Sequence, residues 1–180
     1  MPAEYFEARE RALLGERYER LYAAPQETAA RGVTVSALRT TPEEFAARAD
    51  FPLRPSPFCK AAFVVERPDF KPGRHPYHHA GVFYSQEPSA SSTAPLLGVR
   101  PGMRVLDLCA APGGKSLLLI EEMGDEGRLV SCDVSENRVQ LIRKAVERMG
   151  FAHVEPRVSD GTKPDADLPM ADAILVDAPC

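Results

Sequence analysis

The fold of this 180-residue chain is decided by the stretch Val105-Leu106-Asp107-Leu108-Cys109-Ala110-Ala111-Pro112-Gly113-Gly114-Lys115-Ser116. Its apolar start predicts a buried strand, its small residues predict a turn, and the apolar run 117–120 predicts a helix. Glycines let the backbone approach a ligand closely, and the first turn of a helix directs free N–H groups at the preceding turn. The sequence therefore predicts the strand–turn–helix unit of a nucleotide-type site.

Three known turns could occupy this place. A dinucleotide fingerprint needs G-x-G-x-x-G, and the chain has only the pair Gly113-Gly114 here. A P-loop ends as Gly114-Lys115-Ser116 does, but Cys109 stands where its first glycine belongs. The third candidate is a turn for S-adenosylmethionine, because its adenosine and cationic methionine end need no cradle of triphosphate-binding amides.

The run Asp107 to Ser116 resembles the cofactor motif of the Sun-type RNA cytosine-5 methyltransferases. This resemblance favours the third turn over the P-loop and implies S-adenosylmethionine as the cofactor. The residues that it implies for cofactor binding are Cys109, Ala110, Ala111, Pro112, Gly113, Gly114 and Lys115.

Composition excludes several classes of protein. The chain is 44% hydrophobic, no apolar run reaches the length of a membrane span, and Met1 is not followed by a basic-then-apolar signal, so we expect a soluble cytoplasmic protein. Its four cysteines form no C-x-x-C pair, which argues against a disulfide framework or a zinc site. Residues 1–84 hold 12 Lys/Arg and 11 Asp/Glu, whereas residues 85–180 hold 10 and 15, an asymmetry that fits an RNA-facing N-terminal part.

Residues 1–84 are predicted to form a small α+β appendage. The patterns predict a helix over 3–23, a short strand at Val33–Val35, a helix starting at Thr41-Pro42-Glu43-Glu44, and a strand at 61–65. The proline-punctuated segment 50–81, which contains this strand, resembles the N-terminal appendage of the ribosomal-RNA members of the Sun group.

Residues 85–180 alternate strands and helices after a first helix over 88–97. Strands are expected at 103–108, 128–132, 153–158 and 172–176, with helices at 113–123 and 136–149, the second capped by Ser135 and ended by Gly150. The stretch 159–170 is too polar for a full helix. Such alternation predicts a parallel, doubly wound α/β sheet. The resemblance implies a Rossmann-like class I methyltransferase sheet, truncated after its fourth strand.

Acidic residues follow strands two, three and four of this sheet. Ligands of open parallel sheets bind beyond the carboxyl ends of the strands. We therefore expect Asp133 to accept hydrogen bonds from ribose hydroxyls, Asp160 to meet the adenine amino group, and Asp177 to face the cofactor. Asp107 is expected to orient the turn.

The run His75-Pro76-Tyr77-His78-His79-Ala80-Gly81 invites a metal hypothesis. Its spacing matches no standard zinc pattern, so we predict no metal and interpret the run as a polar connector near the mouth of the site.

The last four residues, Asp177-Ala178-Pro179-Cys180, resemble the fourth motif of the Sun group. The resemblance implies that Asp177 holds the ring nitrogen and amino edge of a flipped cytosine and that Cys180 assists breakdown of the covalent adduct. The principal nucleophile of the family belongs to a later Thr-Cys motif, so we expect this chain to be an N-terminal fragment that is inactive by itself.

The sequence thus indicates an S-adenosylmethionine-dependent methyltransferase that makes 5-methylcytosine in small-subunit ribosomal RNA, acting without a metal or a membrane. One alternative is an RNA-binding remnant that binds cofactor without turnover. The other is a methyltransferase for tRNA, protein or a small molecule. The sequence does not specify the oligomeric state.

Overall fold

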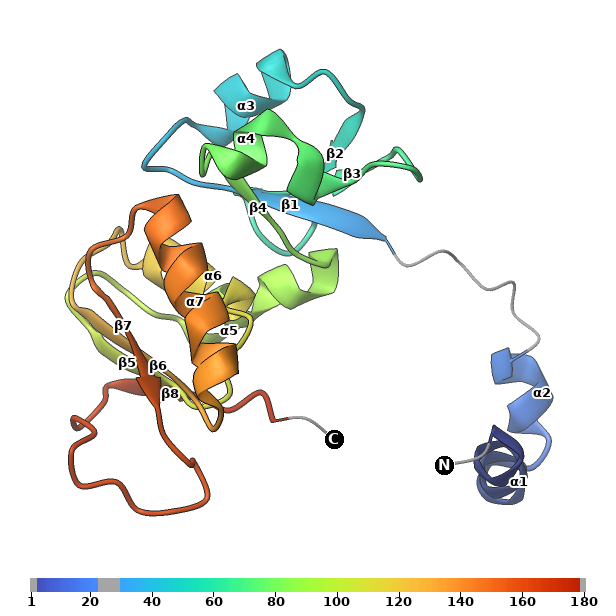
Figure 1. Cartoon of the computed structure of the whole chain (residues 1–180). Coiled ribbons are helices and arrows are strands. Elements are labelled where there is room, and N and C mark those ends of the chain that lie inside the picture. The colour runs from blue at the N-terminus through green and yellow to red at the C-terminus, as the bar shows by residue number, and fades with distance from the viewer. Residues whose placement is uncertain (1–2, 23–29, 179–180) are drawn as a thin grey trace.

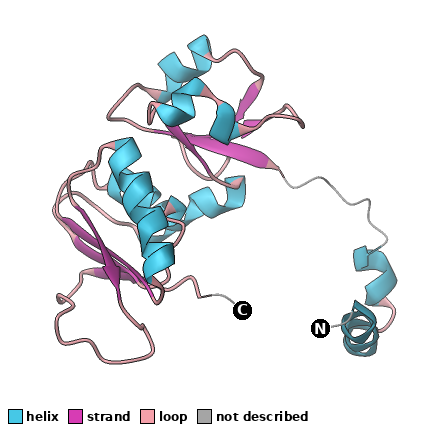
Figure 2. Cartoon of the chain, viewed as in Figure 1, coloured by secondary structure: helices cyan, strands magenta, loops and turns pink. Residues whose placement is uncertain are grey.

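The computed structural model describes residues 3–22 and 30–178, which form two four-stranded sheets (Figure 1). The N-terminal sheet is antiparallel with the order β2-β3-β1-β4, and the C-terminal sheet is parallel with the order β7-β6-β5-β8. Figure 2 shows the two sheets in magenta, each with helices beside it. Within the described residues, no helix is both long and apolar enough to span a bilayer.

The helices and strands follow one another along the chain with these bounds: α1 Ala3–Leu14, α2 Arg17–Tyr22, β1 Arg31–Val35, α3 Pro42–Arg48, β2 Leu53–Pro55, β3 Ala62–Val65, 3₁₀-helix η1 Pro72–Arg74, α4 Pro76–His79, β4 Phe83–Ser85, 3₁₀-helix η2 Pro88–Ser92, α5 Thr93–Leu97, β5 Arg104–Asp107, α6 Gly114–Glu122, β6 Arg128–Asp133, α7 Glu136–Met149, β7 Val154–Val158 and β8 Ala173–Leu175.

The N-terminal sheet is buried on both faces. Val33 and Val35 of β1 point into an aromatic cluster beneath α3 and α4, where Phe45, Phe63 and Phe83 pack together. The intervening residues, Thr34 of β1 with its neighbours Ala62 and Tyr84, face the other way and are also buried. Since side chains alternate along a strand, burial of successive residues means that the sheet is covered on both sides.

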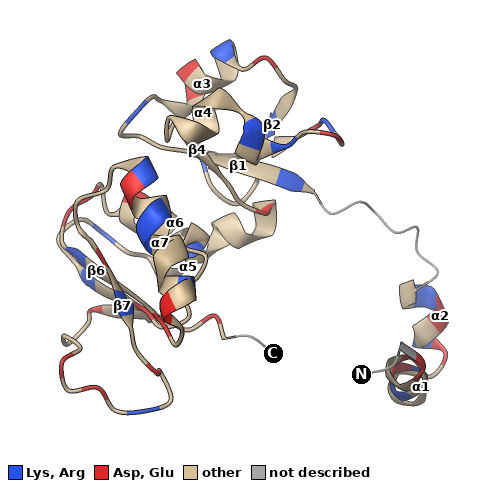
Figure 3. Ribbon diagram, viewed as in Figure 1, with Lys and Arg blue, Asp and Glu red and all other residues tan. Residues whose placement is uncertain are grey.

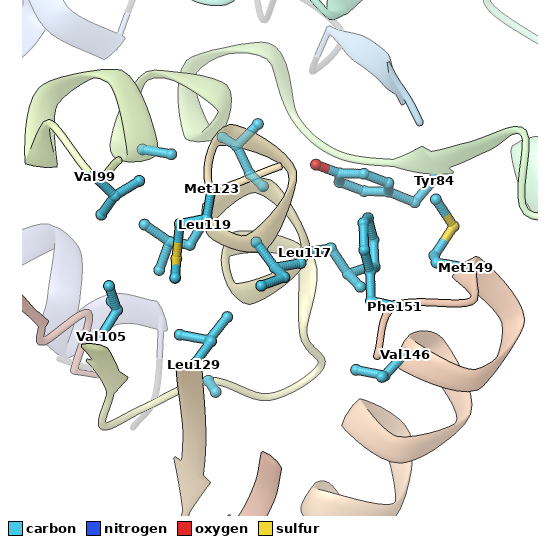
Figure 4. Close-up of a cluster of buried hydrophobic side chains, with 14 of the residues drawn as sticks. Tyr84, Val99, Val105, Leu117, Leu119, Met123, Leu129, Val146, Met149 and Phe151 are labelled. Carbon is cyan, nitrogen blue, oxygen red and sulfur yellow. The ribbon is translucent and has the colours of Figure 1, made fainter. Parts of the chain in front are cut away.

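The second face of this sheet is covered by the C-terminal half of the chain. Figure 4 shows Tyr84 among Leu117, Met149 and Phe151, in the same cluster as Val105 and Leu129 of the parallel sheet. The two halves therefore share one hydrophobic core.

Polar contacts fix this interface at two places. Arg148 of α7 donates to the carbonyl oxygens of His78 at 2.8 Å and of Phe83 at 3.5 Å. Gly81 lies so close to α7 that a Cβ there would stand 2.3 Å from the Arg148 carbonyl oxygen. On the other side, the Glu121 carboxyl of α6 accepts a hydrogen bond from the Ala37 backbone N–H. Because a Cβ at position 81 would clash with the backbone of α7, any residue other than glycine there would force the two halves apart.

The two faces of the parallel sheet are covered differently. Val105 and Leu129 lie in the shared core with α5, α6 and α7, whereas Leu106, Val130 and Cys132 face the opposite side. That side is covered by the connection between β7 and β8, because Leu168 and Ala171 pack against it. The prediction that the helix between the third and fourth strands is very short or missing is thus confirmed, because the described residues 159–172 contain no helix.

Most predicted elements are confirmed, with shifts of one or two residues at their ends. Thr41 caps α3 by accepting from the Glu44 N–H at 3.2 Å, and Gly150 ends α7 in the left-handed conformation. Ser135 precedes α7 as expected, but its side chain makes no capping hydrogen bond. Asp133 is the last residue of β6 and does not follow the strand.

Three differences concern the N-terminal half and its junction. The helix expected over 3–23 is two helices, broken at Gly15 with φ +54°, and residue 23 lies outside the described residues. The helix expected over 88–97 begins as the 3₁₀-helix η2. The strands β2 and β4 and the short helix α4 were not predicted, since three or four residues are too few for a periodic pattern.

Glu121 generates a prediction about stability. Burial raises the pKa of its carboxyl to about 7, with the nearby Glu122 and Asp125 charges acting in the same direction. Between the ordinary carboxyl pKa and this value, the folded protein holds a proton that the unfolded chain has released. The free energy of unfolding therefore falls as pH rises through that window. We expect Glu121→Gln, which keeps the acceptor oxygen, to be more stable than the parent at pH 8 by roughly 1–3 kcal/mol.

The measurement is urea denaturation across that pH range. Glu147→Gln, at an exposed position of α7 whose charge is not among those that act on Glu121, is the matched control and should leave the slope of stability against pH unchanged. Parallel curves for the parent and Glu121→Gln would contradict the assignment of this proton to Glu121.

Candidate active site

A cavity of about 410 Å³ lies beyond the carboxyl ends of the four parallel strands. The chain leaves β5 and β6 through α6 and α7 on one face, and returns from β7 to β8 across the other face. The connections diverge between the adjacent strands β5 and β8, which makes this a topological switch point. The cavity is lined by residues from the ends of all four strands: Leu108, Cys109, Asp133, Val134, Arg138, Ser159, Asp160, Gly161, Thr162, Val176 and Ala178.

The turn after β5 is held by backbone hydrogen bonds. The Ala110 N–H donates to the Cys132 carbonyl of β6 at 2.8 Å, and the Gly113 N–H donates to Ala110 at 2.7 Å. Gly113 has φ +110°, a conformation that other residues rarely adopt, and precedes the first residue of α6. The predicted strand–turn–helix unit is confirmed as a structure. Of the residues from Cys109 to Lys115, Cys109 lines the cavity and the other six do not.

A buried hydrogen-bond chain supports this turn. The Ser131 hydroxyl of β6 donates to Ser116 of α6 at 2.9 Å, and the Ser116 hydroxyl donates to the Asp107 carboxylate of β5 at 2.7 Å. Burial raises the pKa of Asp107 to about 6, and the Ser116 hydrogen bond opposes this rise. Asp107 thus acts beneath the turn, joining β5 to α6, and lies outside the cavity lining.

Asp133 lies at the wall of the cavity with both oxygens engaged. One accepts from the Ala111 N–H at 3.2 Å, and the other accepts from Arg138 Nε at 2.9 Å. Arg138 also donates to the Ala111 carbonyl oxygen at 3.2 Å. Since a carboxylate has about four lone-pair sites, each oxygen can accept one further hydrogen bond from a ligand.

Arg138 is a site residue that sequence reasoning missed. It lies in the first turn of α7, and its guanidinium ties the carboxylate at the end of β6 to the cofactor-type turn after β5. A basic residue one turn after a strand-end acid is the only signal that the sequence offers.

Asp160 follows β7 as predicted and lines the cavity. Its carboxylate accepts from the Thr162 N–H at 3.1 Å and the Thr162 hydroxyl at 2.6 Å, and pairs with Lys163 at 3.0 Å. These hydrogen bonds, led by that of the Thr162 hydroxyl, lower the pKa of Asp160 to about 2. The acid is therefore ionised and held in a fixed turn.

Asp177 follows β8, and its carboxylate is bonded to the Lys115 ammonium of α6. Lys115 thus reaches across from the turn to the end of the neighbouring strand. Neither residue lines the cavity itself, although Val176 and Ala178 on either side of Asp177 do. Pro179 and Cys180 lie outside the described residues.

The histidine run is placed away from the cavity, so the expectation of a connector near its mouth was wrong. His78 accepts from Arg148 near the end of α7, and α7 begins beside Asp133. Arg148 lies twelve residues after Glu136, the first residue of α7, so the two are about 18 Å apart along the helix axis. His75 instead contacts Asp50 at 3.1 Å within the N-terminal half. Among residues 3–22 and 30–178, no three His, Cys, Asp or Glu side chains gather as metal ligands would.

Comparison with protein families matches both halves of the chain. A model described as 16S rRNA methyltransferase RsmB/F matches residues 94–180, and one described as the N-terminal domain of 16S rRNA methyltransferase RsmF matches residues 1–88. Among curated proteins, ribosomal RNA small subunit methyltransferase F of Escherichia coli O157:H7 is 34% identical over an alignment of 174 residues, which covers 91% of this chain and 36% of that protein. The chain thus spans just over a third of the length of these relatives.

Solved structures share the arrangement of both sheets. A methyltransferase homologue from Pyrococcus horikoshii is 29% identical, with a TM-score of 0.73 over 88% of this chain and 52% of that one. The crystal structure of PH0851 is 26% identical, with a TM-score of 0.84 over 98% of this chain and 41% of that one.

The buried hydrogen-bond chain leads to a prediction. We expect Ser116→Ala to lower the free energy of unfolding by about 1–3 kcal/mol, because it leaves the buried Asp107 carboxylate without this donor. Ser131→Ala is the matched control: it keeps the Ser116–Asp107 bond and should cost less. Urea denaturation of the three proteins at pH 7.5 measures the difference, and an equal loss in both variants would contradict this role of Ser116.

Proposed function

Because this chain belongs to the 16S rRNA methyltransferase RsmB/F family, we propose that its cavity binds S-adenosylmethionine and that the protein methylates small-subunit ribosomal RNA. The observation that carries the proposal is the cavity at the switch point, where an apolar wall meets two fixed carboxylates, Asp133 and Asp160. S-adenosylmethionine carries no triphosphate, so its site needs no cradle of phosphate-binding amides.

The residues present fit this cofactor. The volume of about 410 Å³ lies in the range of small-molecule sites, and Leu108, Val134 and Val176 offer apolar surface to an adenine ring. Asp133 accepts from the ribose hydroxyls through its remaining lone pairs, while Arg138 holds its carboxylate in a fixed orientation. Asp160 accepts from the adenine amino group, and the turn from Cys109 to Lys115 borders the methionine end.

The cofactor, when bound, supplies an electrophilic methyl group on a sulfonium sulfur. We propose that the acceptor is carbon 5 of cytosine, as the resemblance to the Sun group implies. In that chemistry a thiolate adds to carbon 6, carbon 5 takes the methyl group and loses its proton, and the thiolate then leaves. Asp177, oriented by Lys115, holds the ring nitrogen and amino edge of the flipped base, and Cys180 assists release. The attacking thiolate is assigned to the later Thr-Cys motif of the family.

We assign a different role to each half of the chain. Residues 85–180 form the cofactor part, and residues 1–84 form the part that faces the RNA. Bacterial ribosomes are assembled in the cytoplasm, so we place the protein there. The names of the curated relatives support ribosomal RNA over tRNA, protein or a small molecule as substrate.

Cofactor binding is tested by calorimetry with S-adenosylhomocysteine, the demethylated product. We expect Asp133→Asn to lower the affinity roughly 10–150-fold, equivalent to about 1.5–3 kcal/mol, because it removes the charged acceptor for the ribose. Arg138→Gln should lower it less, since the acid remains but is no longer oriented.

Asp172→Asn is the matched control, because that carboxylate directly precedes β8 and pairs with Arg104, the first residue of β5, at the amino ends of the strands and so away from the cavity. It should bind like the parent. Unchanged affinity in Asp133→Asn would refute the site. Tight binding of magnesium ATP that is lost in Lys115→Ala would favour the P-loop instead.

The reaction is tested on the product of the whole gene that contains these residues. Incubated with small ribosomal subunits and cofactor carrying a labelled methyl group, it should place the label on carbon 5 of cytosine, as read by nuclease digestion and mass spectrometry. Asp177→Ala should abolish transfer while S-adenosylhomocysteine still binds. Label on another base or on protein would overturn the cytosine assignment.

A further inference from the structure

A second depression, of about 220 Å³, lies on the N-terminal half beside η1 and shares no residue with the cofactor cavity. Its lining is mostly basic and aromatic: Arg67, Asp69, Phe70, Lys71, Arg74, His75 and Pro76. The proposed function leaves this depression unexplained.

Four cations surround the depression. Arg67, Lys71 and Arg74 line it, and Arg31 at the start of β1 donates to the Phe70 carbonyl oxygen. The charges act on the same neighbours: Arg67 and then Arg31 lower the pKa of Asp69, and His75 and then Arg67 lower that of Asp50. Arg67 and Arg31 thus act on one carboxylate, and Lys71 and Arg74 line the same depression as Arg67, so the four cations form one field.

This field is only partly neutralised. Arg67 pairs with Asp69 at 3.1 Å, and Asp50 is bonded to His75. Within the described part of the chain, no carboxylate lies at ion-pair distance from Lys71 or Arg74. Figure 3 shows basic positions in blue beside β1 and β2, on α3 and on the loop before it, and acidic positions in red on the loop from β7 to β8. The depression thus keeps an excess of positive charge.

The backbone of the depression is held in place. Phe70 stacks on Phe51 with ring centroids 4.2 Å apart, and His75 packs against Phe51 at 5.3 Å. Pro72 begins η1 and Pro76 begins α4, which fixes φ at both positions. Gly73, between the two unpaired cations, has open space where a Cβ would lie. A ligand therefore meets a preformed site and an uncovered backbone.

We infer that this depression binds phosphate groups of the RNA backbone, through Lys71 and Arg74. The inference rests on the proposed function, because the RNA is the substrate proposed above. A shallow, cationic surface suits a phosphodiester, and such contacts fix the register of an RNA without reading its sequence. The site positions the substrate from the half that carries no cofactor.

The test compares the 180-residue chain with Lys71→Gln/Arg74→Gln for binding to a labelled RNA hairpin, between about 50 and 200 mM KCl. Each lost phosphate contact removes about 0.7–0.9 from the slope of log affinity against log salt. We therefore expect the slope to fall by about 1.4–1.8 and the affinity near 100 mM salt to fall about tenfold. Lys71→Arg/Arg74→Lys should keep the parent slope.

The matched control is Arg48→Gln/Lys60→Gln, which removes the same charge from exposed positions of the same half outside the depression. An equal loss in this control would mean a diffuse field and would overturn the inference. So would unchanged binding in Lys71→Gln/Arg74→Gln, or competition by millimolar inorganic phosphate or by phosphatidylserine vesicles that matches competition by unlabelled RNA.

S-adenosylhomocysteine binding is measured on the same proteins and should be equal in all of them. A parent chain that binds the cofactor product but not the hairpin would overturn this inference alone. A chain that binds the hairpin but not the cofactor product would instead overturn the proposed function.

Discussion

Three buried side chains, Ser131, Ser116 and Asp107, form one hydrogen-bond chain that joins β6, α6 and β5. In the interior of a protein such bonds are strong, and a missing partner is costly, so the three elements can pack in only one arrangement. That arrangement fixes where α6 begins and therefore the course of the turn before it. The cavity, the Asp133 carboxylate and the Arg138 bridge all take their positions from this frame.

The same frame extends into the N-terminal half. Tyr84 of β4 lies in the core of the parallel sheet, and Arg148 and Glu121 bond to the backbone of the other half. The N-terminal sheet is thus held against the C-terminal half by both apolar and polar contacts. A substrate held at Lys71 and Arg74 would be held at a fixed place relative to the acidic cavity.

Much of this arrangement could be predicted because it depends on local chemistry. The Thr41 cap, the Gly150 stop and the buried strands follow from residue type and period, and the positions of Asp133 and Asp160 follow from the strand ends that the pattern predicts. The sequence could not reveal contacts between distant segments. Arg138 and the Lys115–Asp177 pair depend on how strand ends meet, β2 contains a proline that hides a strand, and the histidine run faces the far end of α7.

The helix-free connection from β7 to β8 has a consequence for dynamics. It covers one face of the sheet with little more than Leu168 and Ala171, and Asp165 holds it through Ser159 and Arg157. Segments with so few apolar contacts open at a small fraction of the global free energy. Its amide protons would then exchange with solvent long before those of β5 or β6. Since the same connection supplies the cavity residues from Ser159 to Thr162, a ligand that binds there would slow this exchange and draw the outer face of the sheet into the cooperative core.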